Sequence, residues 1–198
     1  SQLDHETKLI FDRIYNDYYF SRHDAFWEKQ AYWKLPAIID ASDMLICGED
    51  LGMIPHSVPG VMKALDILSL EIQRMPKGNT EFGIVQHYPY MSVCSPSSHD
   101  MPTIRGWWEA DPEMAARFFH TYLHWFGIPP KDCTPDIVKA VVDDHLSSPS
   151  MLAIFPIQDL IGMDGHLRNP YAGSEQINIP EDPNHYWKFR FHMPVEQL

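Results

Sequence analysis

The sequence predicts an α/β fold built on parallel strands, and two observations support this prediction. Short apolar runs occur four times, and each leads into polar or charged residues, whereas most of the intervals between them have helical spacing. One strand and helix unit of a typical barrel takes about 30 residues. Four such units account for most of the 198 residues but for only half of a closed barrel. The runs begin at Met44, Leu65, Tyr90 and Ser150.

The composition indicates a globular protein and limits the classes of molecule that it is expected to bind. Hydrophobic residues make up 44% of the chain and the formal net charge is -12, so nucleic acid and anionic membranes would be repelled, whereas a neutral substrate would not. The 13% of aromatic residues includes flat faces that suit sugar rings, although most large aromatic residues fill cores. The three cysteines lack CxxC spacing and no run of 18 apolar residues occurs. We therefore expect a cytoplasmic protein without a disulfide framework.

Residues 1–43 are predicted to form a helical lead-in. Apolar side chains recur at helical spacing from about residue 8 to residue 41. Ser21 can cap a second helix within this stretch. Pro36 is expected to kink or divide it, because proline removes a backbone donor from the helix.

The run Met44–Cys47 has the length of a buried strand, and the paired carboxylates Glu49 and Asp50 follow where that strand would end. The sequence then predicts a short helix over 56–65, before the second apolar run, which ends near Arg74. In a barrel of parallel strands, a carboxylate at the C-terminal end of a strand is typical of a catalytic residue. The alternative is a helix cap or an ion pair in a loop.

The second half of the chain contains two further strand candidates. Residues 77–90 are predicted to be a loop, and the strand Tyr90–Val93 leads from it into the sequence SSHDM. The fourth run contains the polar pair Gln158 and Asp159. Residues 165–198 show no periodicity and are expected to be an irregular segment that closes over the site or the sheet.

Two helices are predicted between these strands. A helix over Asp111–Phe126 has an acidic N-cap and a proline in its first turn, and Gly127 ends it. Thr134 opens the next helix.

Glu49 and Asp100 are the candidate catalytic residues. A carboxyl group that faces a partly dry cleft can act as a general acid. Two carboxylates in one cleft are the equipment of glycosidic bond cleavage, in which one protonates the leaving oxygen and the other stabilises an oxocarbenium-like centre. His99, beside Asp100, could bind a sugar hydroxyl. The alternative is that His99 and Asp100 belong to a turn with a satisfied imidazole.

Other chemistries find little support. His120 and His124 have the spacing that places two imidazoles on one helix face, but the glutamate of HExxH and an acidic third ligand are missing, so we expect no metal. The segment Asp143–His145 is interpreted as a solvated helix end. No GxGxxG, P-loop or GxSxG motif occurs, so we expect no cofactor. Of the adjacent Trp107 and Trp108, at most one can form a sugar platform, and we take Trp108 as the candidate.

These residues carry a family resemblance. The sequence GEDLG, followed about fifty residues later by SHD and RGWW, resembles the amylomaltase and disproportionating-enzyme family of 4-α-glucanotransferases. The resemblance covers nearly the whole chain. Five stretches are similar to the plant cytosolic branch and its bacterial relatives: GEDLGMIP, EIQRMPKG, SSHDMPTIRGWW, PSMLAIFPIQDL and HYWKFR.

The resemblance implies a fold and an activity. The fold would be a (β/α)8 TIM barrel, of which residues 1–198 would form the C-terminal half of the catalytic domain, with strands five to eight. The activity would be retaining transfer of glucosyl or α-1,4-glucan units between maltose or malto-oligosaccharides and glucan acceptors. Glu49 matches the general acid/base, Asp100 the aspartate that stabilises the transition state, and His99 its sugar-binding neighbour.

Three further residues are implied to bind substrate. Gln73 matches the glutamine of the strand that follows. Arg74 replaces an aromatic residue found in many amylomaltases, so we expect a different acceptor subsite. Asn169 lies near the segment that matches the family's RMN-P-G.

One catalytic residue of the family is missing from the chain. Its nucleophile is an aspartate in an RxDH-like motif, and Asp4–His5 has neither the arginine nor a preceding apolar strand. Because a retaining enzyme needs a second carboxylate about 5–5.5 Å from the acid/base, we expect the isolated chain to be inactive. Its partner would be the N-terminal half of the barrel, or a second copy bound through the exposed half-barrel surface. The alternative is a non-catalytic carbohydrate-binding or interaction fragment.

Overall fold

The structure is a computed structural model that describes residues 3–197. The chain divides into two compact units, Ser1–Leu70 and Glu71–Leu198, and each is described by itself. Within the described residues, no helix combines the length and the apolar character needed to cross a membrane.

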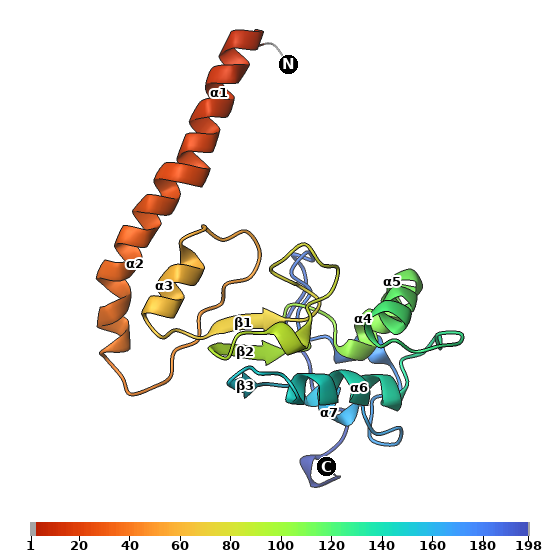
Figure 1. Ribbon diagram of the computed structural model, residues 1–198. Coiled ribbons are helices and arrows are strands. Elements are labelled where there is room, and N and C mark those ends of the chain that lie inside the picture. The colour runs from red at the N-terminus through yellow and green to blue at the C-terminus, as the bar shows by residue number, and fades with distance from the viewer. Residues whose placement is uncertain (1–2, 198) are drawn as a thin grey trace. The chain divides into compact units, whose positions relative to one another are not determined.

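One long helix opens the first unit (Figure 1). It consists of α1 (His5–Asp17), a π-helical turn (Tyr18–Arg22) and α2 (His23–Ile39) without a break. The expected cap at Ser21 is wrong, because that residue lies inside the π-helical turn. The expected division at Pro36 is also wrong. Pro36 lies in the last turn of α2, where the helix needs only three more residues before it ends.

The two parts of this helix differ in packing. No residue of α1 is buried, and its large apolar side chains are exposed. By contrast, α2 contributes to a hydrophobic cluster with α3 (Val58–Ala64). The Asp24 side chain also accepts hydrogen bonds from the backbone and the hydroxyl of Ser57, which precedes α3. The cluster comprises Val58, Met62 and Ile67, with Trp27, Leu35, Ile39, Ile46, Ile54 and Leu65 packed around them.

The predicted strand Met44–Cys47 is reduced to one bridge. Cys47 pairs in parallel with Leu68, and the Ile46 carbonyl accepts a hydrogen bond of 2.9 Å from the Leu68 backbone. Met44 is 75% exposed, so the expectation of a buried strand is wrong at its start. What remains of the prediction is a parallel bridge at Cys47, two residues before Glu49.

The sheet has three strands in the order β1-β2-β3. They are β1 (Ser69–Ile72), β2 (Ser92–Ser95) and β3 (Leu152–Ala153). The strands β2 and β3 are parallel, with Val93 opposite Leu152 and Cys94 opposite Ala153. The strand predicted at Tyr90–Val93 therefore exists but begins two residues later. The parallel pairing agrees with the α/β prediction.

Helices of the second unit follow the strands, and side-chain caps begin most of them. The Thr103 side chain caps α4 (Ile104–Ala110), a helix that the sequence analysis did not predict. Asp111 caps α5 (Pro112–Arg117), and Thr134 caps α6 (Pro135–Leu146), as predicted. The short α7 (Ile157–Ile161) packs against α6 (Figure 1).

The helix predicted over Asp111–Phe126 is shorter than expected. A π-helical turn (Phe118–Tyr122) follows α5, and helical structure ends there. His124 has a φ of 55° and Gly127 a φ of 105°, so both adopt the left-handed conformation. The chain therefore turns before the glycine that was expected to end the helix.

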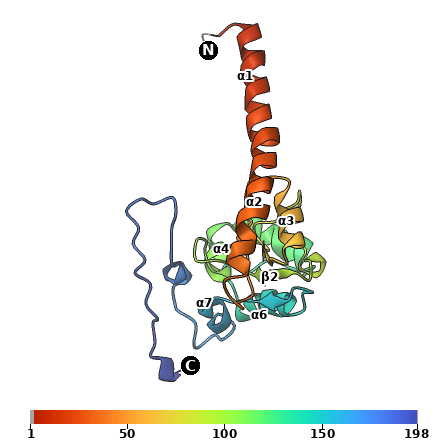
Figure 2. The ribbon, with the colours of Figure 1, turned by 90° about the vertical axis from the view of Figure 1, so that its left-hand side faces the viewer.

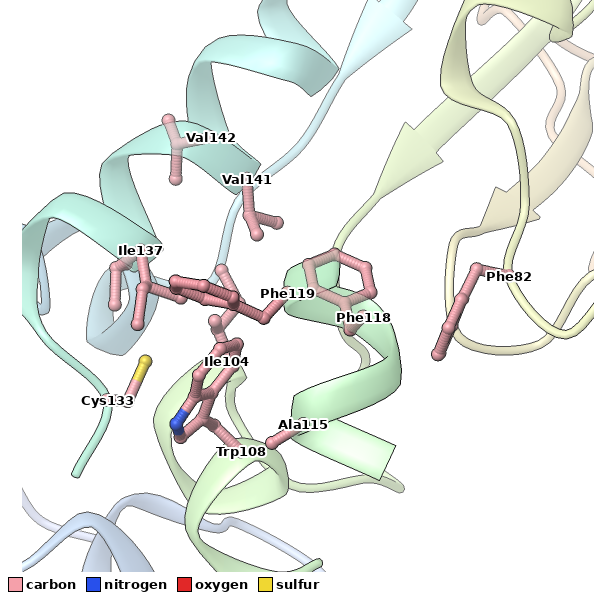
Figure 3. Close-up of a cluster of buried hydrophobic side chains, with 11 residues drawn as sticks. Phe82, Ile104, Trp108, Ala115, Phe118, Phe119, Cys133, Ile137, Val141 and Val142 are labelled. Carbon is pink, nitrogen blue, oxygen red and sulfur yellow. The ribbon is translucent and has the colours of Figure 1, made fainter. Parts of the chain in front are cut away.

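The main core lies between α4, the π-helical turn after α5, and α6. Figure 3 shows Trp108, Phe119 and Ile137 from these three elements converging on one another. His145 in the last turn of α6 is fully buried as well, so the interpretation of Asp143–His145 as a solvated helix end is wrong for the histidine. The cluster comprises Phe82, Ile104, Trp108, Ala115, Phe118, Phe119, Cys133, Ile137, Val138, Val141 and Val142.

The described residues from Gly165 onward form an irregular segment. It contains two short 3-10 turns, Ala172–Glu175 and Val195–Gln197. Figure 2 shows the segment as a long coil in blue.

Candidate active site

Glu49 and Asp50 are adjacent but have different surroundings. Asp50 is 4% exposed, and its carboxylate accepts a hydrogen bond of 2.9 Å from the Leu70 backbone. Glu49 is exposed. Gly48 before it packs closely on α3, since a Cβ there would lie 2.9 Å from the Met62 side chain. The fold thus buries Asp50 and leaves the side chain of Glu49 exposed.

His99 and Asp100 lie in the loop between β2 and α4, and they contact each other. The distance from His99 Nε2 to Asp100 Oδ2 is 3.3 Å, and both side chains are about half exposed, at 56% and 51%. Asn178 donates from Nδ2 to Asp100 Oδ1 at 2.6 Å and from its backbone to the His99 carbonyl at 3.1 Å. The Asp100 carboxylate is therefore contacted at both oxygens, by Asn178 and by His99, while about half of its side chain is exposed.

The irregular C-terminal segment supplies two partners that the sequence analysis missed, Asn178 and Trp187. The ring of Trp187 lies 5.1 Å from the ring of His99, and Trp187 is 60% exposed. The only sequence signal was the aromatic cluster HYWKFRFHM, in which no single residue stands out. An exposed indole beside His99 is a suitable surface for a sugar ring.

Buried polar residues lie beneath this loop. Asp159 is fully buried, and its two oxygens accept hydrogen bonds from Ser97 Oγ at 2.6 Å and from the Ile104 backbone at 2.8 Å. Burial raises the pKa of Asp159, and these hydrogen bonds oppose the shift. The sequence analysis noted Asp159 only as half of a polar pair.

The buried ion pair of Arg105 and Glu175 lies near Asp159. Arg105 Nη1 donates to Glu175 Oε1 at 2.5 Å, and Thr103 Oγ1 donates to Glu175 Oε2 at 3.0 Å. Burial raises the pKa of Glu175, while Arg105 and the hydrogen bonds lower it. A small hollow of about 20 Å³ between this pair and His99 has room for roughly one water molecule.

Three residues expected to bind substrate are engaged elsewhere. Gln73 is 1% exposed and has no surface to offer a sugar. Arg74 donates to three backbone carbonyls and lies over Trp107, with 5.2 Å from the guanidinium carbon to the ring centre. Trp108 is 1% exposed, and its indole nitrogen donates to the Pro130 carbonyl. Gln73 and Trp108 are thus buried, and Arg74 is bound to backbone carbonyls, so sugar contacts by these three residues stay predictions.

Asn169 lies in an irregular stretch and is half-buried. Its side-chain oxygen accepts a hydrogen bond of 2.9 Å from the Tyr171 backbone, and its carbonyl accepts one of 2.8 Å from Arg105. A sugar contact by Asn169 stays a prediction.

The two histidines of the metal alternative do not share a helix face. His120 belongs to the π-helical turn, where its Nδ1 lies 3.1 Å from the Trp125 carbonyl oxygen. His124 lies beyond that turn in the left-handed conformation. Among the described residues, no group of three or more His, Cys, Asp or Glu side chains could hold a metal ion.

Asp4, which was compared with the family's nucleophile, has a structural role. Its carboxylate caps α1 by accepting a hydrogen bond of 2.8 Å from the Thr7 backbone. That hydrogen bond lowers the pKa of Asp4.

The comparisons with known proteins give the family. A family model described as 4-alpha-glucanotransferase matches residues 3–195, and the chain belongs to this family. The 4-alpha-glucanotransferase DPE2 of Oryza sativa subsp. japonica is 45% identical over 199 residues, which are 100% of this chain and 21% of that protein. A 4-alpha-glucanotransferase of Chlamydia muridarum is 30% identical over 172 residues, 83% of this chain and 31% of that protein. The chain thus spans between a fifth and a third of these two relatives.

A solved structure supports the fold class. Amylomaltase from Streptococcus agalactiae in complex with acarbose matches 78% of this chain and 29% of its own chain, with a TM-score of 0.58 and 21% identity. A likeness at that identity concerns the fold alone. It agrees with an α/β arrangement of parallel strands and helices.

Proposed function

We propose that the chain forms part of the catalytic domain of a 4-α-glucanotransferase, which transfers glucosyl or α-1,4-glucan units from maltose or malto-oligosaccharides to a glucan acceptor. The observation that carries this proposal is the family match over residues 3–195, which includes Glu49, His99 and Asp100. The rice and Chlamydia relatives are named for the same activity. We further propose a cytoplasmic location and no cofactor.

In this proposal Glu49 is the general acid and base. It would protonate the departing glycosidic oxygen and then remove the proton from the incoming acceptor hydroxyl. Its exposed side chain supports this role, because both the leaving group and the acceptor must reach the same carboxyl group.

Asp100 would stabilise the positive charge that develops on the donor sugar. A carboxylate that is already oriented costs no reorganisation when that charge appears. The hydrogen bond from Asn178 and the neighbouring His99 support such an orientation. His99 would also contact a sugar hydroxyl, next to the exposed ring of Trp187.

We propose that the nucleophile comes from a part of the protein outside these 198 residues, and that this part also completes the (β/α)8 barrel. Apolar side chains on and after β3 support a missing neighbour, since Leu152 is 43% exposed and Ile154 is 57% exposed. A strand with such a surface is normally covered.

A second candidate function is a non-catalytic interaction or carbohydrate-binding fragment, in which the chain binds a partner or a second copy of itself. The exposed apolar side chains of α1 favour this candidate. The isolated polypeptide separates the two, and we expect it to release no glucose from maltose. Glucose release by the isolated chain would contradict the need for an external nucleophile.

The main test uses the full-length parent enzyme. We expect Glu49→Gln to lower glucose release from maltose, with glycogen as acceptor, by about 10²–10⁴-fold, the usual contribution of a general acid. The matched control is Glu28→Gln, which changes another exposed glutamate of the same unit and should keep full activity. Near-normal transfer by Glu49→Gln would refute the assignment.

A further inference from the structure

The loop that carries His99 and Asp100 is held at both of its ends by one guanidinium. We call residues 96–103, between β2 and α4, the Asp100 loop. Arg74, which follows β1, donates from Nε to the Pro96 carbonyl at 3.0 Å and from Nη2 to the Pro102 carbonyl at 2.6 Å. A third contact, from Nη1 to the Thr103 carbonyl, measures 3.4 Å. One side chain thus joins the start and the end of the loop.

The carboxylate of Asp159, which follows the other flanking strand β3, also binds both ends of the loop. Asp159 lies in α7, which follows β3. Its Oδ2 accepts from Ser97 Oγ at 2.6 Å, and its Oδ1 accepts from the Ile104 backbone at 2.8 Å. These two donors again lie at the start of the loop and directly after its end. Because β2 is the central strand, residues that follow both flanking strands contact the ends of its loop.

The two side chains lie in a largely buried place. Asp159 is fully buried, and burial lowers the pKa of Arg74 to about 10, while the nearby Asp159 opposes that shift. The acceptors of Arg74 are carbonyls of three different residues, each reached by a different guanidinium nitrogen, which suits the fixed planar array of five guanidinium donors. A lysine ammonium at the same position has three donors at a single point and cannot span them equally.

The side chains of His99 and Asp100, at the middle of the loop, are held less firmly than its ends. His99 and Asp100 are about half exposed, and Asn178 is the described residue that holds Asp100 from outside the loop. Their positions therefore depend on the backbone between two fixed ends. Misplacement of a catalytic group by about 1 Å can cost about 100-fold in rate.

We propose that Arg74 and Asp159, which we call the loop clamp, are positioning residues that fix both ends of the Asp100 loop and so place the Asp100 carboxylate against the reacting sugar. Neither residue touches the sugar. The inference rests on the role proposed for Asp100. It also gives Arg74 a function that differs from the acceptor subsite expected from the sequence.

The test compares Arg74→Lys and Asp159→Asn with Asp100→Asn in the full-length parent enzyme. We expect each clamp variant to lower kcat for glucose release from maltose by about 100-fold, with little change in KM, because the position of Asp100 matters most in the transition state. The matched controls are Arg117→Lys, in an exposed ion pair with Glu81, and Asp132→Asn at an exposed site. Both controls should retain the parent kcat.

A double-variant cycle separates positioning from general structural support. In the Asp100→Asn background, Arg74→Lys should cause little further loss, because no carboxylate is left to position. Equal fractional losses in both backgrounds would overturn the proposal. So would a folded clamp variant with unchanged kcat, or a loss that only follows the fraction of unfolded protein.

Two outcomes need separate treatment. If Asp159→Asn fails to fold, Ser97→Ala is the deciding variant, because it removes one hydrogen bond of 2.6 Å and leaves the Asp159 side chain in place. We expect Ser97→Ala to lower kcat at least several-fold, and an unchanged kcat would overturn the proposal. If Asp100→Asn keeps full activity, the proposed role of Asp100 is wrong and the clamp proposal is overturned with it. A loss in Asp100→Asn without any loss in the clamp variants overturns the clamp alone.

Discussion

The same residue types occur twice in the second unit, in two different regions. One region is the buried support, which we define as Trp108, His145 and Asp159, and all three side chains are at most 1% exposed. The other is the exposed rim, which we define as Trp187, His99 and Asp100. Each region contains a tryptophan, a histidine and an aspartate.

The comparison shows that burial and hydrogen-bond partners, rather than residue type, distinguish the two regions. Every member of the buried support makes a hydrogen bond within the protein: Trp108 to Pro130, His145 to Val141, and Asp159 to Ser97. Two members of the exposed rim, His99 and Asp100, contact each other and the C-terminal segment, and about half of each side chain is exposed. The rim is therefore exposed, whereas the support is buried, and its Asp159 bonds Ser97 and Ile104 at the two ends of the loop that carries His99 and Asp100.

The largest expected difference is in the free energy of unfolding, when each of the two tryptophans is replaced by alanine. Trp108→Ala should lower the free energy of unfolding by about 3–5 kcal/mol, because it removes a large buried side chain from the core. Trp187→Ala should change it by less than about 0.5 kcal/mol, since its ring is exposed. Urea unfolding followed by circular dichroism measures both. Similar losses in the two variants would remove the distinction between the regions.

The two histidines predict a pH dependence. Burial lowers the pKa of His145 from 6.5, and Nδ1 must donate to the Val141 carbonyl, which leaves Nε2 without a partner. The unfolded chain therefore binds a proton more readily than the folded one below pH 6.5. Stability should be retained above that pH and fall as the pH decreases, with a limiting slope of about 1.4 kcal/mol per pH unit.

Urea midpoints at pH 7.5 and 5.5 check this sign. The difference between the two midpoints should shrink in His145→Gln and persist in the matched variant His99→Gln, whose imidazole is exposed. A pH dependence that survives in His145→Gln would assign it to other groups.

The smallest expected effect is that of Asn178→Ala on kcat, which tests whether the C-terminal segment orients Asp100. Asn178→Ala removes the hydrogen bond of 2.6 Å to Asp100, so we expect kcat in the full-length enzyme to fall by about tenfold, the equivalent of about 1.4 kcal/mol. The control is Asn184→Ala, an exposed asparagine of the same segment. An unchanged kcat would show that the C-terminal segment does not orient Asp100.

The sequence predicted those parts of the fold that depend on local chemistry. The caps at Asp111 and Thr134 and the short helix over 56–65 were predicted from residues close in sequence, and they are present. The parallel α/β class followed from the alternation of apolar runs and helical intervals. Local signals failed at Ser21, where helical structure simply continues through a capping residue.

The site was less predictable, because its construction depends on contacts between distant residues. Asp159 bonds Ser97 across 62 positions, and Asn178 reaches Asp100 across 78. No spacing rule links such pairs. Trp108 was taken as the candidate sugar platform of two adjacent tryptophans, whereas the fold buries it and exposes Trp187.

The roles of Glu49 and Asp100 can be separated with a donor whose leaving group needs no proton. In the full-length enzyme, Glu49→Gln should lose transfer from maltose but keep most of the first step with an α-glucosyl fluoride, because fluoride departs without protonation. Asp100→Asn should slow both donors alike, since the positive charge on the sugar develops in either case. The measurement is the rate of fluoride release beside the rate of glucose release. Equal losses with both donors in Glu49→Gln would contradict the assignment of Glu49 as the general acid.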